Sequence, residues 1–137
     1  MVRGNSRMGE FEIIERYFAP LTEGDPLASG LADDAALVDV PDGQSLVATK
    51  DMMVSGRHFL PDDPADLIGR KLLRANLSDL AAMGATPKAY LLGIALPDSI
   101  DEDWVAAFSG GLAEDQLSYG LHLIGGDTVA TAGQLTL

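Results

Sequence analysis

The chain has 137 residues, 47% of them hydrophobic, and a formal net charge of −12 at pH 7. This length predicts one domain with a hydrophobic core of its own. The lack of cysteine excludes disulfides and thiolate metal sites, and no apolar run approaches the roughly 20 residues of a membrane span. The acidic balance argues against nucleic acid and anionic membranes as partners, so a phosphate ligand would need divalent metal or a local group of basic residues.

The N-terminal part begins with an irregular stretch. Residues 1–8 hold two arginines without a hydrophobic region after them, so they predict a disordered extension of a cytoplasmic protein rather than a signal peptide. Residues 9–137 are predicted to form a single α+β domain. Its first element is a short amphipathic helix over residues 9–17 that Pro20 ends, followed by a loop rich in turn formers over residues 22–31.

Helices and strands alternate in the rest of the chain. Periodicity and capping residues predict helices over residues 64–82 and 101–119. The apolar run of residues 87–96, set between prolines, predicts an interior strand buried on both faces. The other expected strands cover residues 35–38, 45–54, 121–124 and 134–137. This order predicts a mixed β-sheet with helices packed on one face, whose bare face is covered by a second subunit or a further domain.

The helix predicted over residues 64–82 carries a carboxylate on its apolar stripe. Ile68, Leu72, Ala75 and Asp79 recur at three- and four-residue steps, which predicts that Asp79 faces the interior. An ionised carboxylate buried there needs a cation, a metal or a proton to compensate it. The structural alternative is that Asp79 only caps or hydrogen-bonds a neighbouring loop.

Further acidic residues lie where predicted strands begin or end. Strand ends converge in space, and carboxylate oxygens that converge from separate elements suit Mg²⁺. Paired glycines would also let backbone N–H groups approach a phosphate closely. The structural alternatives are that the adjacent Asp33 and Asp34 are solvent-exposed and that Asp51 only marks a strand end, and the familiar glycine-rich phosphate motifs are absent. The residues concerned are Asp33 and Asp34 before one strand, Asp51 at the end of another, and Asp127 after Gly125-Gly126.

Several segments together resemble the thiamine-monophosphate kinase family, over nearly the whole chain from Gly9. The block Asn76–Ala85 is specific to that branch. The acidic and glycine signatures are shared more loosely with aminoimidazole-ribonucleotide and selenophosphate synthetases, which use ATP without a Walker loop. The other matching segments are Gly9–Phe11 with Arg16–Phe18, Asp33–Leu37, Thr49–Asp51 with Gly56–Phe59, and Gly125–Thr128.

The resemblance implies the N-terminal ATP-binding domain of the aminoimidazole-ribonucleotide synthetase-like superfamily, which forms homodimers. It implies Mg²⁺-dependent transfer of the ATP γ-phosphoryl group to thiamine monophosphate, giving thiamine diphosphate and ADP. Because the family's enzymes carry a second half with further site residues, the chain is expected to be an N-terminal half that is inactive alone. Two alternatives stay open: another ATP-using member of the superfamily, and a non-catalytic dimerisation or metal-binding module.

The resemblance also implies roles for individual residues. By matching position the metal ligands are Asp34, Thr49, Lys50, Asp51, Asp79 and Asp127. Gly126, Asp127 and Lys50 fall on the nucleotide site, and His58, which from the residues alone is typical of a surface histidine, falls on the substrate site. Two positions depart from the family pattern: Lys50 stands where many relatives have a hydroxyl residue, and Ala130 stands where an arginine often follows the glycine motif.

Overall fold

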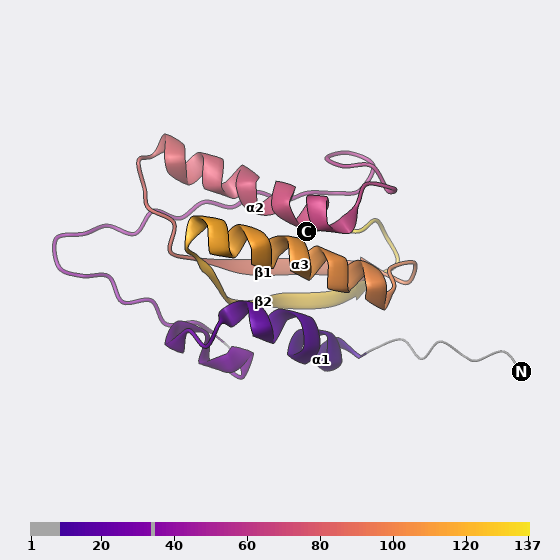
Figure 1. Ribbon diagram of the computed structural model, residues 1–137, viewed down its shortest axis with the longest axis horizontal. Coiled ribbons are helices and arrows are strands. Elements are labelled where there is room, and N and C mark those ends of the chain that lie inside the picture. The colour runs from indigo at the N-terminus through magenta and orange to yellow at the C-terminus, as the bar shows by residue number, and fades with distance from the viewer. Residues whose placement is uncertain (1–8, 34) are drawn as a thin grey trace, which may run out of the picture.

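The computed structural model describes residues 9–33 and 35–137, so the predicted extension 1–8 and Asp34 lie outside the described residues (Figure 1). Within the described part, no helix is long and apolar enough to cross a bilayer. The regular elements are α1 (Glu10–Ile13), α2 (Ala65–Ala82), β1 (Ala89–Pro97), α3 (Glu102–Tyr119) and β2 (His122–Thr131); a π-helical turn (Ile14–Phe18) and two 3-10 segments (Ala19–Thr22 and Pro26–Leu31) follow α1.

The two long helices form where the sequence predicts them. At the start of α3, the Asp101 carboxylate accepts a hydrogen bond from the Trp104 backbone N–H at 2.9 Å, which satisfies an otherwise free donor. At the end of α2, Gly84 adopts a φ of 67°, a conformation that favours glycine and stops the helix. The loop predicted for residues 22–31 is partly ordered into the 3-10 turn Pro26–Leu31, which the Asp25 side chain caps.

Strands β1 and β2 are parallel, and α3 is the crossover between them. The strand β2 is longer than the predicted 121–124, because it continues through Gly125-Gly126 to Thr131. A Cβ on Gly126 would lie 1.9 Å from the Leu92 carbonyl oxygen, so only glycine lets β2 approach β1 this closely. The prediction that the strand ends at Gly125-Gly126 is therefore wrong, because both glycines lie within β2.

The larger mixed sheet predicted from the sequence is not formed by the described residues, whose only regular sheet has two strands. Residues 35–38 and 45–52 form no strand, since they pair with no other strand of the described residues. Residues 134–137 contact both β1 and residues 53–55: Ala95 of β1 and Thr136 exchange hydrogen bonds of 2.8 and 3.2 Å, and Met53 and Leu137 exchange two of 2.9 Å. Among the described residues, antiparallel pairing is limited to these contacts and to the Ser55 N–H, which donates to the Leu135 carbonyl oxygen at 3.0 Å.

Helices α2 and α3 pack against each other unusually closely. A Cβ on Gly111 would lie 2.1 Å from the Asp66 carbonyl oxygen, and one on Gly69 would lie 2.7 Å from the Phe108 carbonyl oxygen. The two glycines thus bring the helix backbones into contact around Phe108, whose side chain is completely buried. In Figure 1 both helices lie on the same side of the strands, and α1 lies beside β2.

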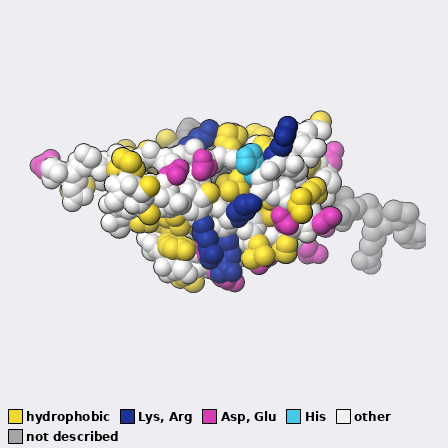
Figure 2. Space-filling view, turned by 90° about the horizontal axis from the view of Figure 1, so that it is seen from above, with side chains coloured by type: hydrophobic (Ala, Val, Ile, Leu, Met, Phe, Trp, Pro, Cys, Tyr) yellow, Lys and Arg dark blue, Asp and Glu magenta, His cyan; other side chains and the backbone are white. Residues whose placement is uncertain are grey.

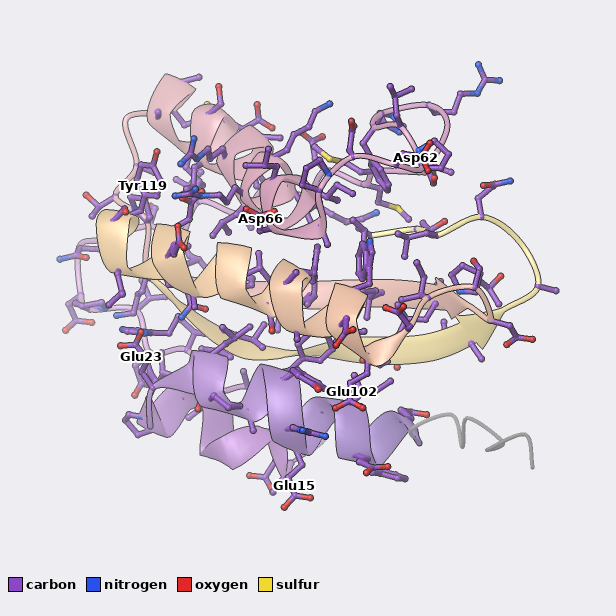
Figure 3. All side chains as sticks on the ribbon, turned by 45° about the vertical axis from the view of Figure 1, so that its right-hand side comes forward. Glu15, Glu23, Asp62, Asp66, Glu102 and Tyr119 are labelled. Atoms are coloured by element: carbon purple, nitrogen blue, oxygen red, sulfur yellow. The ribbon has the colours of Figure 1, made fainter. Side chains whose placement is uncertain are left out.

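The N-terminal helical segment is tied to the start of α3. The Tyr17 hydroxyl donates a hydrogen bond of 2.6 Å to Glu102, which is labelled in Figure 3, and Arg16 forms an ion pair with the same carboxylate. Further in, Gln116 of α3 donates to the Leu21 carbonyl oxygen at 3.0 Å. These contacts fix the segment that leads into residues 31–38.

Burial along β1 alternates, so the prediction of a strand buried on both faces is wrong. Leu92, Ile94 and Leu96 are buried, whereas Leu91 is 67% exposed. The reason is that helices cover one face of the sheet, while side chains of successive strand residues point to opposite faces. The face that carries Leu91 is left largely open.

Candidate functional site

A cavity of about 580 Å³ lies between the open face of the sheet and residues 31–38. Its volume is in the range of small-molecule sites. Most of its lining is apolar, and two carboxylates, Asp33 and Asp127, contribute polar groups. The lining residues are Ile14, Phe18, Leu31, Asp33, Ala35, Ala36, Val38, Leu91, Leu92, Gly93, Leu123, Ile124, Gly125, Gly126, Asp127 and Thr128.

Pairing in the sheet directs Asp127 to this cavity. Asp127 is registered with Gly93, and Gly125 with Leu91. Directly registered residues of a parallel pair project to the same face, so Asp127 shares the open face with Leu91. The exposed Asp127 carboxylate therefore lies beside an apolar hollow rather than in the core.

A second group of polar residues joins the loop at 49–51 to the C-terminal half of α2. The Thr49 hydroxyl donates a hydrogen bond of 3.1 Å to Asp79 Oδ2. The Asp51 backbone N–H donates one of 2.8 Å to Asn76 Oδ1. We call Thr49, Asp51, Asn76 and Asp79 the loop–helix cluster. It brings together three of the residues predicted to bind metal, at one end of α2.

The prediction that Asp79 faces the interior is wrong, because its side chain is exposed. The periodicity is correct, since Ile68 and Leu72 on the same stripe are buried, but the last core residue of α2 is Leu77. Met83, further along the stripe, is 70% exposed. The apolar stripe of α2 therefore continues beyond the last residue that the core covers. The structural alternative, a hydrogen bond between Asp79 and a neighbouring loop, is the correct one.

His58 lies in a tight exposed turn. Its Nδ1 accepts a hydrogen bond of 2.9 Å from the Val54 backbone N–H, and its carbonyl oxygen accepts one from Lys71 Nζ. The imidazole thus holds the turn together, with Nδ1 as the acceptor, so the neutral tautomer carries its proton on Nε2. Lys50 is exposed in the loop beside the loop–helix cluster.

The predicted carboxylates that the structure describes are not gathered into one preformed metal site. Among residues 9–33 and 35–137, no three Asp, Glu or His side chains are close enough to hold an ion together. The loop–helix cluster nevertheless offers a fitting pair of donors, because the Thr49 and Asp79 oxygens are 3.1 Å apart. Adjacent ligands on an octahedral Mg²⁺, at 2.0–2.1 Å from the ion, are separated by about 2.9 Å. Asp127, in the cavity, is not part of this pair.

Helix α2 is held to α3 by a buried carboxylate, Asp115. Arg74 donates to Asp115 from Nε at 2.7 Å and from Nη2 at 2.8 Å, and Arg70 donates from Nε at 3.2 Å. Burial by itself would raise the pKa of Asp115, but the hydrogen bonds from Arg74 and Arg70 outweigh it and hold that pKa below its ordinary value. Figure 2, which looks at the molecule from above, shows several Lys and Arg side chains on this face, although the chain as a whole is strongly acidic.

Residues 32–137 match the family described as AIR synthase related protein, N-terminal domain. The chain belongs to this family. Its helices and its parallel pair of strands are the described part of that fold, which confirms the expected superfamily.

Individual relatives and solved structures show which members of this family the chain is similar to. The chain is 48% identical over 128 residues to the thiamine-monophosphate kinase of Caulobacter vibrioides, covering 93% of this chain and 36% of that protein. A crystal structure of the thiamine-monophosphate kinase from Stenotrophomonas maltophilia superimposes with a TM-score of 0.76 at 41% identity, covering 94% and 40% of the two chains. A structure described as AaThiL complexed with AMPPCP and TMP gives a TM-score of 0.60 at 27% identity, covering 63% and 28%.

These matches confirm the resemblance read from the sequence motifs. The chain spans about two fifths of the length of the relatives that it matches. The activity and substrates of the whole enzymes are therefore properties of longer chains.

One residue of the loop–helix cluster, Asn76, was assigned no role of its own from the sequence. Asn76 belongs to the motif Asn76–Ala85, and its side chain accepts the hydrogen bond that joins the loop at Asp51 to α2. A signal for it exists, because asparagine is a poor residue for a helix interior and so indicates a side-chain role there. Asp33, which the sequence predicts together with its chain neighbour Asp34 as a candidate to face a cation, lines the cavity.

Proposed function

We propose that this chain is the N-terminal part of a thiamine-monophosphate kinase, which transfers the γ-phosphoryl group of Mg²⁺-ATP to thiamine monophosphate and yields thiamine diphosphate and ADP. The observation that carries the proposal is the 48% identity over 128 residues to the kinase of Caulobacter vibrioides. The cavity beside Gly126 and Asp127 supports it, because an apolar hollow edged by a few polar groups suits a nucleotide.

We assign the metal ligands to Asp34, Thr49, Asp51, Asp79 and Asp127, with the backbone of Lys50 beside them. The 3.1 Å separation of the Thr49 and Asp79 oxygens supports two of these assignments. A bound Mg²⁺ supplies charge neutralisation for the transferred phosphoryl group. The described residues offer only part of a coordination shell, and Mg²⁺ commonly completes its shell with water and substrate phosphate.

The remaining residues act on the substrates in this proposal. Gly126 and Asp127 border the nucleotide, and Lys50 supplies a positive charge to its phosphates. His58 contacts thiamine monophosphate through the edge of its ring that does not bind Val54. A general base is not required, because the acceptor phosphate is itself a nucleophilic anion.

We also propose that the open face of the sheet is covered in a homodimer. Leu91 and Val129, which project from this face, are 67% and 46% exposed. Apolar side chains of the unpaired segment add to the exposed surface, with Leu37 at 74% and Leu46 at 60%. Exposed apolar area of this kind is typical of an interaction site. Sedimentation at micromolar concentration measures the oligomeric state, and a strictly monomeric chain would contradict the proposed homodimer.

Residues 1–137 alone are expected to bind Mg²⁺-nucleotide weakly and not to form thiamine diphosphate. The chain spans about two fifths of the length of its relatives, and misplacement of reacting groups by about an ångström can cost roughly 100-fold in rate. Turnover by purified 1–137 at the rate of a full-length relative would show that the residues contributed by longer chains are dispensable.

The acceptor is tested with a chimera in which residues 9–137 replace the matching segment of the Caulobacter vibrioides kinase. We expect ATP-dependent phosphorylation of thiamine monophosphate, and no turnover with the substrates of aminoimidazole-ribonucleotide or selenophosphate synthetases. Turnover of one of the latter substrates would favour another member of the superfamily. A folded chimera that processes none of them would favour a non-catalytic module.

A further inference from the structure

We propose that Asn76 is a positioning residue that fixes the loop bearing Asp51 on helix α2, so that the Asp51 carboxylate is presented to a metal ion. The inference extends the proposed function, because it takes Asp51 as a metal ligand. It rests on the contacts of the Asn76 amide, which reach both the helix and the loop.

The Asn76 side chain makes two hydrogen bonds that together fix its orientation. Its Nδ2 donates to the Leu72 carbonyl oxygen at 3.1 Å, one turn earlier in α2. Its Oδ1 accepts from the Asp51 backbone N–H at 2.8 Å. Because a carbonyl oxygen accepts and an N–H donates, only one orientation of the amide satisfies both partners. The helix thus presents a fixed acceptor to the loop.

The loop has few other attachments. Residues 41–52 are exposed throughout and form no strand. The Thr49–Asp79 hydrogen bond is a second attachment, but it uses oxygen atoms that are themselves proposed to bind metal. The Asn76 bond uses a main-chain N–H and leaves both Asp51 carboxylate oxygens free. It is therefore the attachment that can persist while Thr49, Asp51 and Asp79 all bind an ion.

The position of Asn76 fits this role. The residue is half-buried, while Asp51 and Asp79 on either side of the tether are exposed. Asparagine costs stability in a helix interior relative to leucine or alanine, so its presence needs a compensating contact. Groups that orient a metal ligand without touching the ion commonly change metal affinity 10- to 100-fold when they are removed.

The test compares Asn76→Leu and Asn76→Ala with Ser78→Ala, an exposed control two residues along the same helix. Neither Asn76 variant changes the net charge, and leucine and alanine favour the helix, so the fold is expected to persist. Two quantities are measured on the 137-residue chain: amide hydrogen exchange of Asp51 by NMR, and the Mn²⁺ dissociation constant from water-proton relaxation.

We expect both Asn76 variants to speed Asp51 exchange at least about tenfold and to weaken Mn²⁺ binding about tenfold, with exchange in β1 unchanged. The Ser78 control is expected to change neither quantity. Unchanged Asp51 exchange in both variants would overturn the tether. Faster exchange with unaltered Mn²⁺ binding would overturn the positioning role. Since the exchange measurement does not depend on phosphoryl transfer, failure of the tether and failure of the kinase proposal are told apart.

Discussion

Arg74 and Asp115 form a bidentate ion pair whose two hydrogen bonds are 2.7 and 2.8 Å long. The Asp115 side chain is completely buried, while that of Arg74 is 51% exposed. The pair therefore reaches from the core between α2 and α3 out to the surface. It anchors the helix that carries Asn76 and Asp79, so the cluster at the end of α2 depends on it.

Replacing Asp115 with asparagine is expected to lower the free energy of unfolding by about 2–4 kcal/mol, because Arg70 and Arg74 lose a buried charged partner. Glu114→Gln is the matched control: Glu114 pairs with Arg70 at 2.8 Å but is 66% exposed, so a loss below about 1 kcal/mol is expected. Urea unfolding at pH 7 measures both. Equal losses for the two variants would contradict the role given to burial.

The same pair predicts how stability depends on pH. Because the pKa of Asp115 is lower in the folded chain than in the unfolded chain, its stabilisation is complete above the unfolded pKa of about 4. It is lost as pH falls from there through the folded pKa. Between pH 5 and pH 3 the Asp115→Asn variant should therefore lose less stability than the unaltered chain. Equal losses of stability in the Asp115→Asn variant and the unaltered chain would show that Asp115 does not contribute to the pH dependence of stability in acid.

The adjacent glycines of α3 are expected to respond in opposite ways to alanine. A Cβ at position 111 would meet the Asp66 backbone at 2.1 Å, whereas one at position 110 meets nothing within 4 Å. Gly111→Ala should cost about 2–3 kcal/mol by forcing the helices apart. Gly110→Ala should stabilise the chain by up to about 1 kcal/mol, because alanine favours a helix. Thermal unfolding separates the two, and destabilisation by both would be inconsistent with this packing.

Strand β2 offers a similar comparison with β1. Gly126→Ala is expected to cost about 2–3 kcal/mol, because the new methyl group would lie 1.9 Å from the Leu92 carbonyl oxygen. Gly93→Ala, on the open face with nothing within 4 Å, should change stability by less than about 0.5 kcal/mol. Hydrogen exchange across β1 and β2 reports the damage directly. Unchanged stability of the Gly126→Ala variant would show that β1 and β2 do not approach each other this closely at Gly126.

The sequence was sufficient to predict the two long helices and the family, since helix caps, periodicity and motifs are local features. It was not sufficient for Asp79, because periodicity gives the face of a helix but not the length of the core beneath it. Of the strands expected at 35–38 and 45–54, only residues 53–54 are paired, with residues 136–137, and the rest find no partner among the described residues. Gly126 was read as a strand break because its real constraint, the Leu92 carbonyl oxygen, is distant in sequence.

We infer that this chain supplies part of a metal-dependent phosphotransferase site, and the Mg²⁺ dependence of thiamine diphosphate formation is the measurement that addresses this inference. The measurement uses the chimera with the Caulobacter vibrioides kinase, with and without Asp79→Asn. Asp79 is exposed at the end of α2, so the substitution should leave the fold intact, which thermal unfolding checks.

We predict that the unaltered chimera forms thiamine diphosphate, and that Asp79→Asn raises the Mg²⁺ concentration for half-maximal rate and lowers turnover by about tenfold or more. An unchanged Mg²⁺ titration in the Asp79→Asn chimera, or a folded chimera without turnover, would show that these residues do not form such a site.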